Sequence, residues 1–325
     1  MRLSLKNIIT PSIPLAILSI ISCFSLWVFT YIKSAFSGHP TVFLEQGNYQ
    51  WDFLNNVGIS NLISIAFTLA NAFLLTQLNN KFTIIRTRTF LPILIFVLLQ
   101  CTWSNTHLAD VSDITVTLFL LSLFYFLDMY RNPMGVELAY MGCLLIGIGC
   151  ILINNLIMVV PIIWIGFGMF QSLSLRTFLA SVFGILTPMI FYVVGAYYFL
   201  PDITFDQLFN FSYNIDFDLN HYTLRSLTYI GLMTLTFLIC IVGLYSNSRA
   251  DATHTRVKLN FLLLLFISVS SFALFFVHTH VGFLPIIALL YAIIVSHPFT
   301  LKQNDFYSIV FIVFTLTNIV FALSK

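Results

Sequence analysis

This sequence has few charged residues. Asp, Glu, Lys and Arg make up 8% of its 325 residues, against about 25% in an average soluble domain. Hydrophobic residues make up 59%. So small a share of charge, with so large a share of apolar residues, excludes an ordinary soluble domain. It indicates a protein that crosses a membrane many times.

Several features that mark particular activities are also missing. No ionisable residue lies at the centre of a long apolar stretch, which argues against an ion-coupled pump or transporter. No basic patch with interleaved aromatic residues is present, so we expect no nucleic-acid partner. Nucleophile elbows, phosphate-binding glycine loops and dinucleotide fingerprints are absent. The five cysteines all fall within apolar stretches and predict neither a disulfide framework nor a zinc site. We therefore expect no bound cofactor.

Long apolar stretches dominate the sequence. About 20 apolar residues suffice to cross the hydrocarbon core of a bilayer, and such stretches recur up to the last residues. They predict an all-α fold, a polytopic transmembrane helical bundle that forms a single integral membrane domain over residues 1–325 with no soluble domain. We expect eleven spans, at residues 12–33, 59–79, 90–106, 114–130, 137–153, 156–172, 177–200, 226–246, 259–277, 281–297 and 306–323.

Positive charges are unevenly distributed between the connections of these spans. With the N-terminus in the cytoplasm, eleven of the fourteen Lys and Arg residues lie on the cytoplasmic side, and Lys33, Arg225 and Lys325 lie outside. This bias follows the positive-inside rule, which orients membrane proteins with short loops. It predicts a cytoplasmic N-terminus and, after eleven spans, a C-terminus on the outer side. The first apolar run exceeds the apolar core of about 7–15 residues in a cleavable signal peptide, so we expect an uncleaved first span.

The spans at 137–153 and 156–172 are short, and Asn154 and Asn155 form the turn between them. About 17 helical residues reach roughly 25 Å, less than the hydrocarbon core of about 30 Å. The pair therefore either crosses the membrane twice or forms a re-entrant hairpin. The second arrangement would leave nine full spans.

Small residues recur at every fourth position in two of the spans. Ala139, Cys143 and Gly147 follow this spacing in one span, and Ala180 and Gly184 follow it in another. Small side chains at this spacing let helix backbones approach closely. We expect these faces to pack inside the bundle.

The second span carries a polar face. Asn61, Ser64, Thr68 and Asn71 are spaced three, four and three residues apart, which places them within an arc of about 80° on a helix. Two amides facing lipid would be costly, so this face must meet another helix or a wet cavity. The spacing predicts either interhelical hydrogen bonding or a cavity-lining role.

Acidic residues gather in the first two outer connections. Glu45 and Asp52 lie in the first, and Asp110 and Asp113 lie in the second. Carboxylates from two loops can hold a divalent metal or act as a general base, so these four residues are the candidate catalytic group. The alternative is that Asp113 or Ser112 caps the span that follows and that the other carboxylates are solvated.

Part of the chain resembles a known family. Residues 78–199 look like an uncharacterised family of multi-spanning bacterial inner-membrane proteins, which implies a location in the bacterial cytoplasmic membrane but no activity. The features that carry this resemblance are Asn79-Asn80-Lys81, the run from Arg86 to Pro92, the stretch from Asp113 to Asp128 leading into Arg131-Asn132-Pro133, and the short pair of spans around Asn154-Asn155.

The layout is more remotely similar to the membrane module of GT-C-type glycosyltransferases. That resemblance implies an enzyme acting on a polyprenyl-phosphate-linked sugar outside the membrane, with Glu45 and Asp52, and then Asp110 and Asp113, as base or metal ligands.

Three functions are compatible with the sequence. The low density of motifs favours a non-enzymatic cell-envelope assembly or scaffold component. The GT-C-like glycosyltransferase is the first alternative, and it would add a divalent metal and a polyprenyl-linked lipid as partners. A transporter of a lipid or an apolar solute is the second alternative, favoured by the polar face of the second span. In all three cases, the lipid bilayer is the first partner.

Overall fold

A computed structural model describes residues 13–37, 57–85, 89–132, 134–199, 224–247, 251–275, 280–301 and 305–323. Of these residues, 91% are helical and none lies in a strand, which confirms the predicted all-α class. In chain order the helices are α2 (Ile13–Ser37), α3 (Val57–Phe82), α4 (Leu91–Thr102), η2 (Ser104–His107), α5 (Val111–Asp128), α6 (Gly135–Leu152), η3 (Asn154–Val159), α7 (Val160–Met169), α8 (Leu175–Phe199), α10 (Leu224–Asn247), α11 (Thr253–Phe275), α12 (His280–Leu301) and α13 (Asp305–Leu323).

Eight of the described helices are long and apolar enough to cross a membrane, as expected of a multi-pass membrane protein. They are α3, α5, α6, α8, α10, α11, α12 and α13. The other three expected spans correspond to shorter apolar helices, at Ala16–Phe29, Leu91–Thr102 and Asn154–Met169. The total of eleven spans therefore stays a prediction.

Several helix boundaries differ from those expected, including those of α4 and α11. The span predicted at 90–106 ends as an α-helix at Thr102 and continues as the 3₁₀ helix η2. The hydroxyl of Thr106 donates to Gln100 O and to Trp103 O, both at 2.6 Å, and so stabilises the turn. The helix predicted from residue 259 begins at Thr253, because α11 extends beyond its apolar part and includes Arg256 and Lys258.

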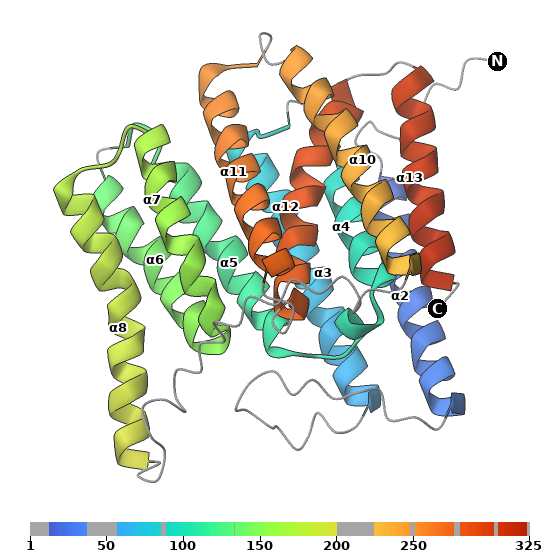
Figure 1. Ribbon diagram of the computed structural model, residues 1–325, viewed down its shortest axis with the longest axis horizontal. Helices are drawn as coiled ribbons and strands as arrows, with labels where there is room; N and C mark the ends of the chain where they lie inside the picture. Colours follow the sequence, from blue (N-terminus) through green and yellow to red (C-terminus); the bar gives the residue numbers. More distant parts are fainter. Residues whose placement is uncertain are drawn as a thin grey trace.

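α12 lies in the middle of the bundle (Figure 1). It packs against α4, α5, α10, α11 and α13. In the 18-residue apolar stretch of α12, 83% of the residues are buried. The corresponding share in α8, which lies at one edge of the molecule (Figure 1), is 17%. All twelve residues of α4 are buried as well. α4 and α12 therefore form the core on which the other helices pack.

α8 is held at that edge by close packing on α6, and the small residues of both helices make this possible. A Cβ added at Gly184 would lie 2.6 Å from Tyr140 O, and one added at Gly147 would lie 2.9 Å from Ile185 O. Only glycine allows the two backbones to approach so closely. The expectation that these faces pack inside the bundle is confirmed.

The short pair after α5 consists of two segments of similar reach. The 18 residues of α6 extend about 27 Å at 1.5 Å per residue. The six residues of η3 and the ten of α7 also extend about 27 Å, because a 3₁₀ helix rises about 2.0 Å per residue. The tighter helix thus compensates for the low number of residues in the second segment.

Candidate functional site

The polar face predicted on the second span lies on α3 and is buried. Asn61, the most exposed of its four residues, has 6% of its surface accessible, and Ser64, Thr68 and Asn71 have less. α3 packs against α2, α4, η2 and α5. The face therefore meets neighbouring helices, as the cost of placing amides in lipid requires.

Two hydroxyls of α3 hold the segment that joins α4 to α5. The Ser64 hydroxyl donates to Thr106 O at 2.9 Å, and the backbone N–H of Ala109 donates to the Ser60 hydroxyl at 2.9 Å. Asn71 Oδ1 is buried without a hydrogen-bond partner among the described residues. The cavity described below is not lined by any of these four residues, Asn61, Ser64, Thr68 and Asn71. A cavity-lining role for them stays a prediction.

Asp110 and Asp113 lie together at the start of α5. Asp110 is the N-cap residue and Asp113 the third helical residue, and each side chain accepts a hydrogen bond from the other residue's backbone, in a capping box. The N–H of Asp110 donates to Asp113 Oδ2 at 3.4 Å. The cap is thus Asp110, and the expectation that Asp113 or Ser112 would cap the helix is wrong, because the helix begins earlier than predicted. Burial raises the pKa of the Asp110 carboxyl above its ordinary value of 3.8.

The other two candidate carboxylates, Glu45 and Asp52, lie outside the described residues. Whether they approach Asp110 and Asp113 therefore stays a prediction. Within the described residues, no group of three or more His, Cys, Asp or Glu side chains is arranged to hold a metal ion. All five cysteines are free and buried.

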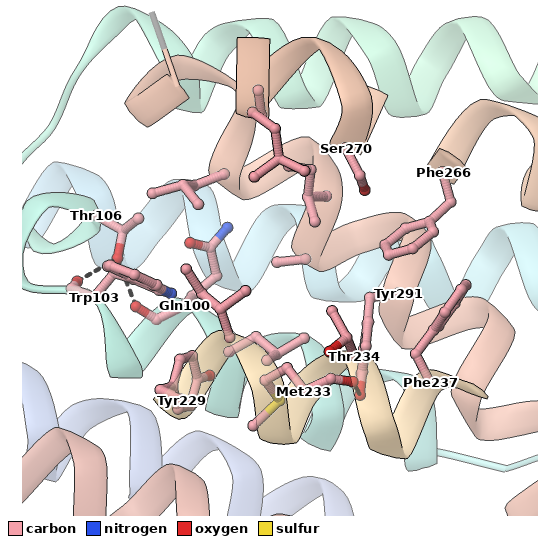
Figure 2. Close-up of a pocket in the computed structure, with 17 residues that line it drawn as sticks. Gln100, Trp103, Thr106, Tyr229, Met233, Thr234, Phe237, Phe266, Ser270 and Tyr291 are labelled. Atoms are coloured by element: carbon pink, nitrogen blue, oxygen red, sulfur yellow. Dashed lines mark hydrogen bonds between the residues drawn. The ribbon is translucent and has the colours of Figure 1, made fainter. Parts of the chain in front are cut away.

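A cavity of about 220 Å³ lies between the end of α4, η2, the first half of α10, the end of α11 and the start of α12. Figure 2 shows its lining side chains. Most are aliphatic or aromatic. The lining residues are Leu99, Gln100, Trp103, Thr106, Tyr229, Ile230, Met233, Thr234, Phe237, Phe266, Ser270, Ala273, Leu274, Leu284, Ile287, Ala288 and Tyr291. We call this space the apolar cavity.

The apolar cavity has a buried floor and an exposed rim. Its floor includes Leu99 and Ala288, which are buried on α4 and α12. Its rim includes Thr234 on α10 and Leu274 on α11, and both are exposed although they also line the cavity. The cavity thus reaches the surface along the line where α10 and α11 face one another, which we call the α10–α11 seam. Phe237 contacts Phe266 across the seam, with ring centroids 4.2 Å apart, and bounds the cavity on one side.

Two tyrosines of the lining hold the surrounding helices together. The hydroxyl of Tyr229 donates to Asn318 Oδ1 on α13 at 2.8 Å. The hydroxyl of Tyr291 lies 2.6 Å from that of Thr236 on α10 and donates to Met233 O at 3.2 Å. Because these polar atoms already have partners in the protein, the rings offer the cavity mainly apolar surface.

An aromatic wall separates the apolar cavity from the end of the bundle. Tyr229 stacks on Phe321 with ring centroids 4.2 Å apart, and the Trp103 ring lies 5.9 Å from that of Tyr229 and 5.8 Å from that of Phe321. Arg225, one turn before Tyr229, donates to Phe321 O at 3.2 Å, and its guanidinium lies 5.3 Å from the Phe321 ring centroid. A cation is thus held beside the wall of an otherwise apolar space.

The size and chemistry of the apolar cavity limit what it can hold. Apolar cavities of about 150 Å³ stay dry and bind benzene, so a space of about 220 Å³ suits an apolar group somewhat larger than one ring. Sites for whole drug-sized ligands measure about 300–1,000 Å³. The cavity therefore fits one segment of an apolar chain rather than a whole lipid.

Sequence reasoning did not find this cavity. Its lining combines residues 99–106 with residues 229–291, which lie more than a hundred positions further along the chain, and most of it consists of residue types that also face lipid. Its polar lining residues within the expected spans are spread over α4, η2, α10 and α11 and form no polar face like that of α3; they are Gln100, Thr106, Thr234 and Ser270.

Comparison of the chain with models of protein families, with curated proteins and with solved structures found no match.

Proposed function

We propose that the protein is a lipid-handling component of the bacterial cytoplasmic membrane, in which one apolar chain of a membrane lipid enters the apolar cavity through the α10–α11 seam. The observation that carries this proposal is the combination of a buried apolar floor with a rim that is exposed where lipid would surround the bundle. A chain could enter from the side without leaving an apolar medium.

Packing energetics support an occupied cavity. Empty space in a protein core costs about 24 cal/mol per Å³. For a closed void of about 220 Å³ this would amount to about 5 kcal/mol, which is an upper limit here because the rim of the cavity is open. A chain segment that fills the space recovers part of this energy, whereas water would find few polar partners there.

The proposal joins two of the functions that the sequence allows. It treats the protein as non-enzymatic, and it assigns it the lipid ligand of the transporter alternative. The capping box at the start of α5 gives Asp110 and Asp113 a structural role that requires no catalysis. With a cytoplasmic N-terminus and the predicted spans, the apolar cavity would belong to the outer leaflet, because α10 would begin on the outer side.

A photoreactive lipid tests the proposal. The purified protein is incubated in bilayers with a phospholipid that carries a diazirine along one acyl chain, and the crosslinked peptides are mapped by mass spectrometry. We expect labelling on the cavity-lining stretches of α10 and α12. Ala288→Phe, which places a ring in the cavity from its floor, should reduce this labelling severalfold.

The matched control is Leu235→Phe. Leu235 lies on the outer face of α10, is 53% exposed and does not line the cavity. This variant should label like the wild type. Equal labelling of the Ala288→Phe and Leu235→Phe proteins would show that the chain does not enter the cavity.

A further inference from the structure

The ends of α3 and α5 and the start of α11 lie at the same end of the bundle (Figure 1). Each of these helices places one charged residue there. Lys81 lies in the last turn of α3, Asp128 is the last residue of α5, and Lys258 lies in the second turn of α11. We call these three residues the lysine cluster.

The two lysines share one carboxylate and one aromatic ring. Lys81 Nζ donates a hydrogen bond to Asp128 Oδ2 at 3.0 Å and lies 4.9 Å from the centroid of the Phe82 ring. Lys258 Nζ lies 4.6 Å from the same centroid. Phe82 in turn packs against Phe124 of α5, with ring centroids 6.1 Å apart. Two ammonium groups are thus gathered beside one carboxylate, and the cluster has an excess of one positive charge.

Lys258 is the buried member of the cluster. It exposes 8% of its surface, whereas the side chains of Lys81 and Asp128 are 52% and 42% exposed. Among the residues that the structure describes, Lys258 has no ion-pair or hydrogen-bond partner, although its Nζ is not enclosed. An aromatic ring attracts an ammonium group but has no lone pair to accept its hydrogen bonds. The three N–H donors of Lys258 are therefore available to an acceptor that approaches from outside the chain.

The cluster lies at the depth of lipid head groups. The apolar stretches that could cross the membrane end at Phe82 on α3 and at Asp128 on α5, and one begins at Thr253 on α11. Head-group phosphates lie where such helices leave the hydrocarbon core. Lysines at this depth attract anionic lipids, and basic sites between transmembrane helices bind their head groups. The surroundings therefore favour a lipid phosphate over a soluble anion.

We propose that the lysine cluster binds the head group of a membrane lipid with one net negative charge, and that its phosphate lies between the ammonium groups of Lys81 and Lys258. Such a head group neutralises the excess positive charge and reduces the repulsion between the two lysines. A zwitterionic head group would bring a cation of its own, and the carboxylate of Asp128 already accepts a hydrogen bond from Lys81.

This site is separate from the apolar cavity. With the predicted topology, the lysine cluster belongs to the cytoplasmic leaflet and the apolar cavity to the outer leaflet. Either proposal can therefore fail without the other.

Native mass spectrometry of the full-length, delipidated protein in detergent tests the site. The protein is titrated with dioleoyl phosphatidylglycerol, which has one net negative charge. In parallel it is titrated with dioleoyl phosphatidylcholine, which has the same chains and a phosphate but no net charge. We expect the first phosphatidylglycerol to bind about tenfold more tightly than the first phosphatidylcholine, as an additional hydrogen bond between charged groups would give.

Lys258→Met keeps most of the length of the buried side chain and removes its charge. It should abolish most of the preference for phosphatidylglycerol. The melting temperature should stay the same or rise, because the ammonium group has no hydrogen bond or ion pair in the described residues to lose. The matched control is Arg176→Met, which removes an exposed cation from the first turn of α8 and should keep the preference.

Asp128→Asn tests the charge balance in the opposite direction. It removes the carboxylate and leaves the ammonium groups of Lys81 and Lys258 without a counter-charge within the cluster. This variant should bind phosphatidylglycerol severalfold more tightly than the wild type. Because poor folding cannot cause a gain of binding, it keeps the proposal testable even if Lys258→Met is unstable.

Four results would overturn the proposal. They are equal binding of phosphatidylglycerol and phosphatidylcholine, an unchanged preference in Lys258→Met, no gain of binding in Asp128→Asn, and displacement of the lipid by inorganic phosphate at millimolar concentration. The last result would identify a soluble anion as the ligand. The Ala288→Phe variant should keep the preference for phosphatidylglycerol, which separates this site from the apolar cavity.

Discussion

Two glycines of α8 allow a direct test of how the edge of the bundle is held together. A Cβ added at Gly184 would lie 2.6 Å from Tyr140 O and 3.1 Å from Cys143 Cβ on α6, whereas one added at Gly195 would find nothing within 4 Å. Both residues lie in the same helix. Replacing either by alanine raises helix propensity by about the same amount, up to 1 kcal/mol. The difference between Gly184→Ala and Gly195→Ala therefore reports the contact with α6.

The size of this difference follows from the geometry. The contact at Gly184 falls about 0.8 Å short of ordinary contact at 3.4 Å, and its partner is backbone, so α8 must move outward to relieve it. A gap of 0.5–1 Å forfeits about a quarter to a half of the dispersion energy of the atoms that it separates, and overpacking typically costs about 1–3 kcal/mol. We expect Gly184→Ala to be about 1–3 kcal/mol less stable than Gly195→Ala.

Reversible unfolding in mixed micelles, followed by circular dichroism or steric trapping, measures the free energy of unfolding of both variants. The expected order of stability is Gly195→Ala at or above the wild type, and Gly184→Ala below it. If the two variants were equally stable, α6 and α8 would not be packed as closely as described, and the role of their small residues would be refuted.

Three further substitutions test the interior. Tyr229→Phe removes the hydrogen bond to Asn318 Oδ1 and should lower the free energy of unfolding by about 0.6–2 kcal/mol, whereas Tyr197→Phe, at a residue 77% exposed, should change nothing measurable in the same melt. Asn71→Leu replaces an amide whose Oδ1 has no partner in the described residues, so it should leave the melting temperature unchanged or raise it, and a marked fall would indicate an essential polar role. Burial raises the pKa of Asp110 in the folded protein above its ordinary value of 3.8. Its contribution to stability is therefore fully present below pH 3.8 and is lost as the pH rises through the pKa of the folded state. Asp110→Asn keeps a good N-cap and should reduce the fall in stability between pH 3.8 and neutrality, and an unchanged pH profile would contradict the burial of this carboxyl.

The sequence predicts the helices well because each one must satisfy its own backbone in lipid. The spacing of small residues along the chain also predicts that one face of α6 and one face of α8 pack closely, but it does not indicate that these two helices pack on one another. Nor does the sequence indicate which helices form the core. α8 and α12 have nearly equal hydropathy, yet 17% of the apolar stretch of α8 and 83% of that of α12 are buried. Hydropathy cannot separate the two helices, because lipid and a protein interior both accept apolar side chains.

The apolar cavity and the buried polar pairs could not be predicted from the sequence, because packing between distant segments creates them. Tyr229 and Asn318 lie 89 residues apart, and only the packing of α10 beside α13 brings them together. Asp251 lies in a predicted connection, and His297 lies at the end of a predicted span. The sequence therefore does not indicate that both are buried, which results from the packing of α11 on α12. The polar face of α3 was visible because its four residues share one helix face.

The central claim is that a lipid chain occupies the apolar cavity, and tryptophan fluorescence tests it most directly. Trp103 lines the cavity, whereas Trp27 is 1% exposed, packs against His107 and does not line the cavity. Single-tryptophan proteins that keep one or the other are placed in bilayers whose lipids carry bromine atoms along the acyl chains, which quench fluorescence on contact. We expect strong quenching of Trp103, weak quenching of Trp27, and a marked loss of Trp103 quenching in the Ala288→Phe background. Equal quenching of the two tryptophans, or quenching of Trp103 that Ala288→Phe leaves unchanged, would contradict an occupied cavity.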